Sequence, residues 1–371
     1  MNISIQPFTD DWIPQVEAFN RRMMAGGLKA ELAFPESPVL DFPVRGAPIW
    51  QEAFLAVEGE AVRGGYYFTH ERYALEGDAC WIANYRHPIS EVVVNKAYKG
   101  LSTTLLNDAE QRQPLLYSVG FGSDRNPNLR RLRAEGWRDV PIPFWFRVVR
   151  PAAFFRNLAF FRKTRLRRMA FDLAAATGVG WLGIKAVQSI KAIGGAGLSG
   201  YSVHAAPEFG DWADELWEIN RPLHLLAAVR DRATLNLRYP PGHTRFVRLA
   251  IAGNGRIVGW AVLLAKQMEN NPYFGCMRVG TIVDCLAAPG HEPAVVRAAA
   301  AQLETAGGDI LVSNQSAAAW DRAFRKAGFL SGPSNYYLSL SPELVRRLSP
   351  LGQNTPRFHI NRGDGAGISR L

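Results

Sequence analysis

Cysteine is scarce in this chain, and the few cysteines are scattered. Only three occur among 371 residues, Cys80, Cys276 and Cys285, and no two have the C-x-x-C spacing. Because disulfide frameworks and structural zinc sites are built from closely spaced cysteines, the sequence predicts neither. We expect no metal cofactor.

Long uncharged hydrophobic runs and a leader sequence are also lacking. No stretch approaches the about 20 apolar residues that a membrane-spanning helix needs. The first residues, Met-Asn-Ile-Ser-Ile-Gln-Pro, contain no basic segment followed by an apolar core. A cytoplasmic protein is therefore expected.

Acidic residues are outnumbered by basic ones. The chain has 33 aspartates and glutamates against 43 lysines and arginines, a net charge of +10. This balance favours anionic partners such as phosphate-bearing substrates, anionic lipid or nucleic acid, without choosing among them. A hydrophobic content of 47% excludes a disordered class, and the length of 371 residues suits two domains.

One stretch, residues 89–112, combines a strand pattern, a basic turn and a helix pattern. The β-branched run Val92–Val94 predicts a strand, and the leucines of residues 101–109 recur at helical spacing. The turn Lys96–Gly100 between them has two lysines and a glycine. A helix that starts at such a turn presents unpaired N–H groups and the positive end of its dipole, which suits a phosphate or pyrophosphate.

This arrangement resembles the central motif of the GNAT (GCN5-related N-acetyltransferase) acyltransferases, which hold the pyrophosphate of acyl-coenzyme A there. The family pattern Gln/Arg-x-x-Gly-x-Gly/Ala falls on Ala97, Gly100 and Ser102 in one register, and begins at Lys99 in another. The resemblance implies acetyl-CoA or another acyl-CoA as co-substrate. The cofactor-binding residues that it implies are Val93, Val94, Lys99, Gly100, Leu101, Ser102 and Thr103. A plain strand–turn–helix connection is the alternative.

The expected order of elements supports this resemblance over the first 150 residues. A strand, a helix and a hairpin across Glu58–Glu60 precede the central motif. A strand near residues 115–120, a helix after Asn126 and a final strand, Phe144–Val149, follow it. This is the order of a GNAT module, a mixed α/β sheet.

The second half of the chain repeats the first. Leu55–Gly59 recurs as Leu249–Gly253, and Leu132–Trp137 recurs as Phe324–Phe329 at nearly the same offset. The matching turn, Ala288–Pro293, contains two prolines and Glu292, which disfavour an anion. We predict an α/β fold of two tandem GNAT-like modules, one binding acyl-CoA and one degenerate, an arrangement similar to Fem-type transferases.

The module boundaries follow from changes in composition. Residues 1–150 form the first module, 151–200 a basic aromatic helical linker, 201–345 the second module and 346–371 a polar tail. The linker is read as an interdomain helix, with contact to an anionic membrane or nucleic acid as alternatives. Its two G-x-G-x-x-G strings lack a preceding strand and are read as helix breaks. The tail is either disordered or folds back over a site.

Candidate site residues follow from the acyl-transfer chemistry that the resemblance implies, in which an amine attacks the thioester and a base takes its proton. Glu91 is the candidate base, with a plain exposed charge as the alternative, and Asn126 takes the place of a family asparagine. The family tyrosine is replaced by Leu132, which leaves the general acid open. In the second half, Asp284 lies inside an apolar strand, where an acid is either buried and paired or faces a substrate cleft. Under the second interpretation it joins Arg238 and Tyr239 as candidate substrate-binding residues.

The expected function is transfer of an acyl group from acyl-CoA to the amine of a small molecule, such as an amino sugar or a cell-envelope precursor. The first alternative is an aminoacyl-tRNA-dependent Fem-type transferase, in which the positive charge would mark an RNA surface. Against this alternative, the linker has no long coiled-coil heptads and the better anion turn lies in the first module. Nucleic acid is expected as a partner only under this alternative. The second alternative is a non-catalytic GNAT-like binding module.

Overall fold

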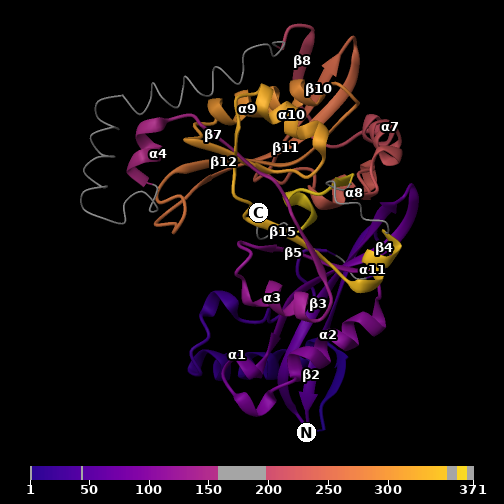
Figure 1. Ribbon diagram of the computed structural model, residues 1–371, viewed down its shortest axis with the longest axis vertical. Helices are drawn as coiled ribbons and strands as arrows, with labels where there is room; N and C mark the ends of the chain where they lie inside the picture. The colour runs from indigo at the N-terminus through magenta and orange to yellow at the C-terminus, as the bar shows by residue number, and fades with distance from the viewer. Residues whose placement is uncertain (1, 43–44, 158–197, 349–356, 366–371) are drawn as a thin grey trace. The chain divides into compact units, whose positions relative to one another are not determined.

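The computed structural model describes residues 2–42, 45–157, 198–348 and 357–365 (Figure 1). These residues divide into two compact units. Unit 1 holds the described residues of 1–140 and 337–352, and unit 2 those of 141–336 and 353–366. The expected boundaries at 150 and 345 differ from this division, since residues 141–150 belong to unit 2 and residues 337–345 to unit 1.

Unit 1 is built on a mixed sheet whose strands follow the order β1-β2-β3-β4-β5-β15-β6. The predicted hairpin is confirmed, because β2 and β3 pair in antiparallel register from Glu58 opposite Ala61. The strands of this sheet are β1 (Ser4–Pro7), β2 (Ile49–Glu58), β3 (Ala61–Leu75), β4 (Asp78–Ser90), β5 (Leu116–Phe121), β6 (Arg138–Pro141) and β15 (Tyr336–Leu340).

Helices cover both faces of this sheet because successive β2 side chains point to opposite sides. Phe54 and Ala56 share a core with α2, whereas Leu55 and Val57 share one with α1. The helices are α1 (Ile13–Ala25), α2 (Leu101–Arg112), α3 (Pro127–Ala134) and α11 (Pro342–Arg347). The short 3₁₀ turns are η1 (Asp10–Trp12), η2 (Ala30–Leu32), η3 (Glu91–Val93) and η4 (Lys96–Tyr98).

Unit 2 has a second mixed sheet, in the order β14-β7-β13-β12-β11-β10-β8. Its strands are β7 (Phe144–Val148), β8 (Tyr201–Ala205), β10 (Val247–Gly253), β11 (Arg256–Gln267), β12 (Arg278–Ala287), β13 (Ile310–Asn314) and β14 (Leu330–Gly332). Helices α9 (Glu292–Thr305) and α10 (Ala318–Lys326) lie together on one face of it (Figure 1). The other helices are α4 (Pro151–Asn157), α7 (Asp211–Asn220) and α8 (Arg232–Arg238), with η6 (Arg221–Leu223) and η7 (Arg362–Asp364).

The two sheets repeat one another, with their last strands exchanged. In each sheet the first four strands of the unit are followed by a fifth strand, which is parallel to the fourth. A strand from elsewhere in the chain comes next, and the sixth strand of the unit follows it. In unit 2 the inserted strand is β7, and in unit 1 it is β15. The prediction that Phe144–Val149 closes the first module is therefore wrong, because β7 pairs with β13 and β14.

The linker and the tail are described only in part. Of the linker, Pro151–Asn157 forms helix α4, and residues 158–197 lie outside the described residues. The glycine string at 178–183 is therefore not described, and that at 195–200 only in its last three residues. In the tail, β16 (Phe358–His359) pairs in parallel with β9 (Leu226–Ala228) of unit 2.

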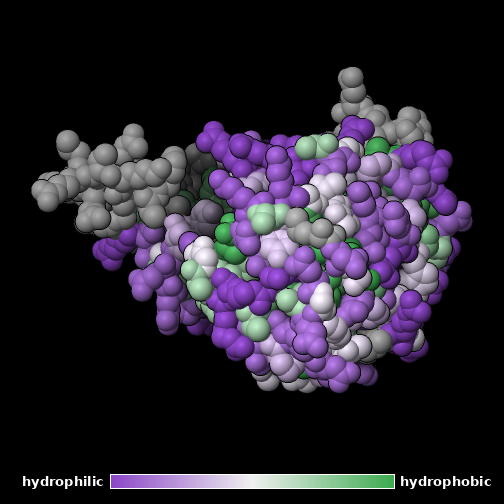
Figure 2. Space-filling view, turned by 90° about the horizontal axis from the view of Figure 1, so that it is seen from below, coloured by the Kyte–Doolittle hydropathy of each residue, from purple (hydrophilic) through white to green (hydrophobic). Residues whose placement is uncertain are grey.

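On the face shown in Figure 2, hydrophobic residues form small groups among hydrophilic ones. No described helix is both long enough and apolar enough to pass through a bilayer. Membrane contact through the aromatic linker stays a prediction, since most of that linker lies outside the described residues.

Candidate functional site

The fourth and fifth strands of unit 1 separate soon after they meet. Strands β4 and β5 are paired in parallel at Ala83 with Leu116 and at Asn84 with Tyr117. Beyond these two pairs each strand continues, to Ser90 and to Phe121, without a register partner in the other. Just beyond these pairs the Ser118 hydroxyl still donates to the carbonyl of Tyr85 at 3.0 Å, so the two strands diverge only after this contact. Where two strands diverge, an extended ligand can add hydrogen bonds to their backbone.

A bulge in β4 lies beside the point where the two strands diverge. Gly65 pairs with Ile89 and Tyr67 with Arg86, so that His87 and Pro88 stand opposite one residue, Tyr66. His87 has a φ of 50°, which a non-glycine residue adopts rarely.

The turn into α2 has the backbone of an anion site. Gly100 precedes the helix with a φ of 99°, and no side chain caps the helix. No described residue accepts a hydrogen bond from the N–H groups of Gly100, Leu101 or Ser102. Lys99 beside them is exposed. These N–H groups, the helix dipole and the lysine together favour a bound phosphate.

The side chains of the first turn of α2 are already engaged. The hydroxyls of Ser90 and Ser102 are 2.6 Å apart, and Thr103 donates to Glu135 at 2.9 Å. The Leu101 side chain belongs to the core. Ligand contacts here would come from the backbone and Lys99, and the Glu135 carboxylate would weaken the attraction of an anion.

Val93 and Val94 do not lie on the central strand. Strand β4 ends at Ser90, Val93 ends the 3₁₀ turn η3, and Val94 follows it. The side chain of Val93 is 62% exposed, whereas Val94 packs toward the core under α1. The prediction of a strand at Val92–Val94 is therefore wrong, whereas contact of Val93 and Val94 with acyl-CoA stays a prediction. A run of three valines has the strand signal, but the bulge moves the strand end ahead of it.

Glu91 is buried and doubly paired. Its carboxylate accepts from Arg63 at 3.1 and 3.2 Å and from Arg22 at 3.3 Å. Only 5% of Glu91 is exposed. Two guanidinium groups occupy the oxygens of this carboxylate, so the geometry is that of an internal ion pair.

Asn126 acts as a helix cap. Its Oδ1 accepts from the N–H of Asn128 at 2.9 Å, and its Nδ2 donates to the carbonyl of Phe121 at 2.9 Å. Both ends of the amide are thus committed to joining β5 to α3. Leu132, at the family tyrosine position, is a core residue with 3% exposure.

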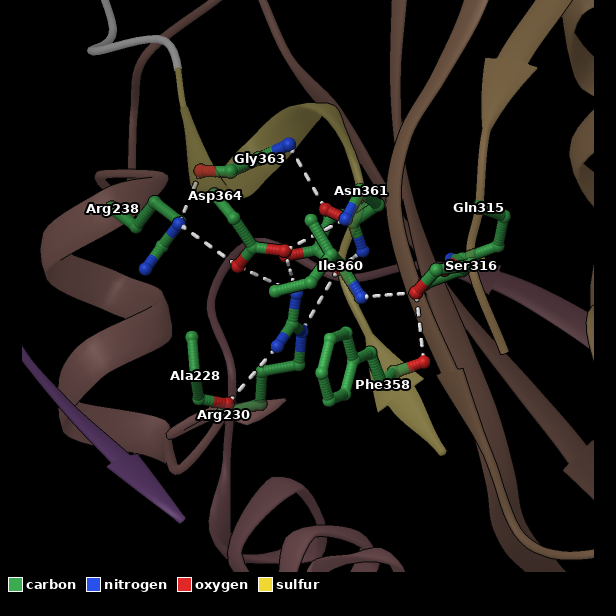
Figure 3. Close-up of polar contacts among 12 residues, drawn as sticks. Ala228, Arg230, Arg238, Gln315, Ser316, Phe358, Ile360, Asn361, Gly363 and Asp364 are labelled. Atoms are coloured by element: carbon green, nitrogen blue, oxygen red, sulfur yellow. Dashed lines mark hydrogen bonds and ion pairs between the residues drawn. The ribbon is translucent and has the colours of Figure 1, made fainter. Parts of the chain in front are cut away.

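In unit 2, the three candidate substrate-binding residues come together in one buried cluster. Asp284 accepts from Arg230 Nε at 3.0 Å and from the Tyr239 hydroxyl at 3.0 Å. Arg230 donates to both oxygens of Asp364 at 2.9 Å, and Arg238 lies 3.6 Å from the same carboxylate. Figure 3 shows the guanidinium of Arg230 pointing toward Asp364. Two positive and two negative charges balance within this cluster.

The tail completes this cluster. The amide of Asn361 donates to Asp284, and Arg238 donates to the carbonyl of Gly363. Ser316, just after β13, holds the segment by accepting from the N–H of Ile360 at 2.8 Å and donating to the carbonyl of Phe358 at 2.7 Å (Figure 3). The tail was expected either to be disordered or to fold back over a site. Residues 357–365 fold back onto this cluster.

The two charged members of the cluster that the sequence did not reveal are Arg230 and Asp364. Arg230 follows the apolar stretch Leu225–Val229, which is a weak signal for a buried charge. Asp364 lies in a polar tail where nothing in the sequence indicates burial. Only the fold brings residues so distant in sequence together.

Burial shifts the proton affinity of groups around the cluster. Desolvation, and then the charges of Arg230 and Arg357, lower the pKa of His224 to about 4. His359, whose ring centre is 5.0 Å from that of His224, has its pKa held well below the usual value by burial and then by Arg230. Burial, and then Asp284, raise the pKa of Tyr239 well above its usual value. Both histidines are thus neutral at physiological pH.

The turn in unit 2 that matches the turn into α2 is built differently. The carboxylate of Glu292 accepts from the N–H of Gly290 at 3.0 Å and occupies the turn before α9. This carboxylate opposes an anion there, as the sequence indicated. Within the described ranges, no group of three or more histidine, cysteine or acidic side chains could hold a metal ion.

Comparisons with known proteins give a consistent fold. No protein-family model and no curated protein sequence matches the chain. Among solved structures, an Enterococcus faecalis V583 protein designated a probable N-acyltransferase matches with a TM-score of 0.51 at 9% identity, covering 93% of this chain and 74% of that one. A GCN5-related N-acetyltransferase from Anabaena variabilis matches with a TM-score of 0.51 at 10% identity, covering 91% and 72%.

Saccharomyces cerevisiae N-myristoyltransferase, solved with bound myristoyl-CoA, matches with a TM-score of 0.51 at 10% identity, covering 92% of this chain and 78% of that chain. At these identities the matches speak for the fold alone. The resemblance to Fem-type transferases stays a prediction. The chain has the fold of the GNAT acyltransferases, in two modules of mixed α/β sheet.

Proposed function

We propose that this protein transfers an acyl group from acyl-CoA to the amine of a small molecule. The observation that carries the proposal is the early separation of β4 from β5 beside the uncapped turn at Gly100. An extended thioester arm could lie in such a gap while its pyrophosphate meets the helix start. The GNAT-like fold supports the same reaction class.

The roles of the chain follow from this placement. The N–H groups of Gly100 to Ser102, with Lys99, would bind the pyrophosphate. The backbone of β4 beyond the bulge would align the thioester with the incoming amine. The amine nitrogen then attacks the carbonyl carbon, the carbon–sulfur bond breaks, and the thiolate leaves while the nitrogen loses a proton. Since Glu91 and Asn126 are engaged, a water chain or the amine's own prior deprotonation is the proposed route for that proton.

Binding of acyl-CoA tests the first step. We would titrate the purified chain with acetyl-CoA and longer acyl-CoA esters by calorimetry, for the wild type, for Lys99→Glu and for Arg138→Glu. Arg138 is an exposed residue of β6 with no ion-pair partner among the described residues, so Arg138→Glu makes the same change of charge away from the turn. We expect Lys99→Glu to weaken binding by about tenfold or more, because a charge-assisted contact becomes a repulsion.

Arg138→Glu should bind as the wild type does. If no ester binds to the wild type, or if both variants bind equally well, the proposed site is refuted. Transfer itself is best followed by mass spectrometry of acylated amines. A thiol reagent would also react with the protein, since Cys276 is free and exposed.

A non-catalytic binding role is a second candidate. It is favoured by Glu91 and Asn126, whose polar atoms are committed to ion pairs and to a helix cap. Binding of acyl-CoA without transfer to any of a broad panel of amines would favour this role, and formation of an acylated amine would exclude it.

A further inference from the structure

Unit 2 contains a cavity of about 510 Å³ that the proposed function does not use. It lies at the end of β12, beside the turn before α9 and the start of α10. The polar residues of its wall are Asn220, His224, Glu292, Arg322, Lys326 and Arg357. Its size falls in the range of small-molecule sites, roughly 300–1,000 Å³.

Three cations line this cavity. Arg322 and Lys326 are four residues apart on α10 and so share one side of the helix, and Arg357 comes from the tail. All three are exposed, and none has an ion-pair partner among the described residues. Arg325 on the same helix contrasts with them, because it pairs with Asp321 at 3.1 Å.

The surroundings compensate this positive charge only in part. Among the described residues of the wall Glu292 is the one acid, and its carboxylate, which opposes an anion at the turn itself, accepts from the N–H of Gly290. His224 is neutral near pH 7 and adds no charge of either sign. Ala317, which precedes α10, offers no side-chain cap, so the first N–H groups of a helix that also lines the cavity stay available.

Apart from its charged residues, the wall is mostly apolar, and Asn220 offers a hydrogen-bond acceptor. Alanine, proline, leucine and tryptophan side chains form its apolar part, among them the nearly buried Trp320. Asn220 is 4% exposed and donates from Nδ2 to the carbonyl of Leu216, while its Oδ1 accepts from no described residue. The wall therefore suits a ligand with a compact apolar or ring-shaped body, a hydrogen-bond donor and an anionic end.

We propose that this cavity is a second ligand site, which binds a phosphate monoester through Arg322, Lys326 and Arg357. Two guanidinium groups and one ammonium match the charge and the three free oxygens of a phosphate dianion. The site lies in unit 2, so it does not depend on the acyl-CoA site proposed in unit 1. A phosphorylated acceptor and the 3′-phosphate end of coenzyme A share this chemistry.

Charge reversal at α10 tests the site. We would titrate the full chain at constant ionic strength with glucosamine 6-phosphate, with coenzyme A and with dephospho-coenzyme A. The test variant is Arg322→Glu with Lys326→Glu, and the control is Lys266→Glu, an exposed residue of β11 outside the cavity. Since two charged contacts are lost, we expect binding of at least one phosphate monoester to weaken by about tenfold or more in the test variant alone.

The ligands separate the two sources. If the test variant loses affinity for glucosamine 6-phosphate alone, the natural ligand is a phosphorylated acceptor. If it loses affinity for coenzyme A but not for dephospho-coenzyme A, the ligand is the 3′-phosphate of coenzyme A. Hydrogen exchange should show ligand-induced protection of peptides covering residues 317–326. The proposal is overturned if none of the monoesters binds to the wild type, or if the test variant binds them as well as the control does.

Lys99→Glu keeps the two proposals distinguishable. This variant should retain binding in the unit 2 cavity even where it loses acyl-CoA at the turn into α2. If Lys99→Glu loses both acyl-CoA and phosphate monoester binding while the α10 variant keeps both, the second site is refuted and the first is retained.

Discussion

At the scale of single residues, burial decides what each titratable group can do. Glu91 and Asp284 were both singled out as acids at strand positions, and both are buried with arginine partners. A buried ion pair costs desolvation of both charges, so it persists only when its hydrogen bonds are complete. Both acids thus hold ion pairs inside their own units.

His224 makes the stability of unit 2 dependent on pH. Its pKa is about 4 in the folded chain against about 6.5 when unfolded, so the unfolded chain binds more protons between these values. The free energy of unfolding should therefore fall as the pH drops from 7 toward 4. His224→Gln should remove on the order of 2 kcal/mol of that fall.

Urea denaturation at pH 7 and at pH 5 measures the effect, with His204→Gln as the control. His204 is exposed, so its removal should leave the pH profile unchanged. Equal pH profiles for the wild type and His224→Gln would show that this histidine is not held neutral by the fold.

At the scale of elements, the segment of β16 and η7 is an integral part of unit 2. It supplies the Asp364 carboxylate to Arg230 and the Asn361 amide to Asp284, all within the interior. Asp364→Asn would leave Arg230 with one carboxylate in place of two. We expect the free energy of unfolding to drop by about 3 kcal/mol or more, because two buried arginines would then share one carboxylate and a buried positive charge would be in excess.

Asp321→Asn is the matched control for this prediction. Asp321 forms an exposed ion pair with Arg325 on α10, and such pairs contribute about 0–1 kcal/mol. Denaturant titration of both variants should show a large change only for Asp364→Asn. Similar small changes in both would mean that the segment does not hold the buried cluster together.

At the scale of the whole molecule, the exchanged strands decide where the chain can be cut. A fragment of residues 1–150 has the boundary that composition suggested, but it lacks β15, which lies between β5 and β6. We expect this fragment to be poorly folded, since the edges of β5 and β6 would lose their partner. Circular dichroism and gel filtration would show weak cooperativity and association.

A joined fragment should rescue the fold of unit 1. The N–H of Ile142 donates to the carbonyl of Tyr336 at 2.9 Å, so a short glycine linker can connect residue 142 to residue 336. Residues 1–142 joined in this way to residues 336–352 should unfold cooperatively as a monomer. A stable, monomeric 1–150 fragment would contradict the role given to β15.

Several features followed from the sequence because they rest on local pattern. The hairpin of β2 and β3, helix α2 and the start of α3 at Asn126 depend on neighbouring residues and were predicted near their observed places. The turn at Gly100 was predicted because a glycine between a strand pattern and a helix pattern is typical of a tight turn. The end of β4 was missed, since the bulge at His87 and Pro88 depends on pairing with β3.

The sequence by itself determined the two-module α/β plan, because alternating apolar patterns and their repetition along the chain are local properties. It also determined which residues are chemically able to act, such as Lys99, Asp284 and Tyr239. Only the tertiary structure decided which sheet each last strand joins and which charges meet in the interior. The physical reason is that strand pairing and buried ion pairs join residues distant in sequence, such as Arg230 and Asp364, and no local pattern encodes their partners.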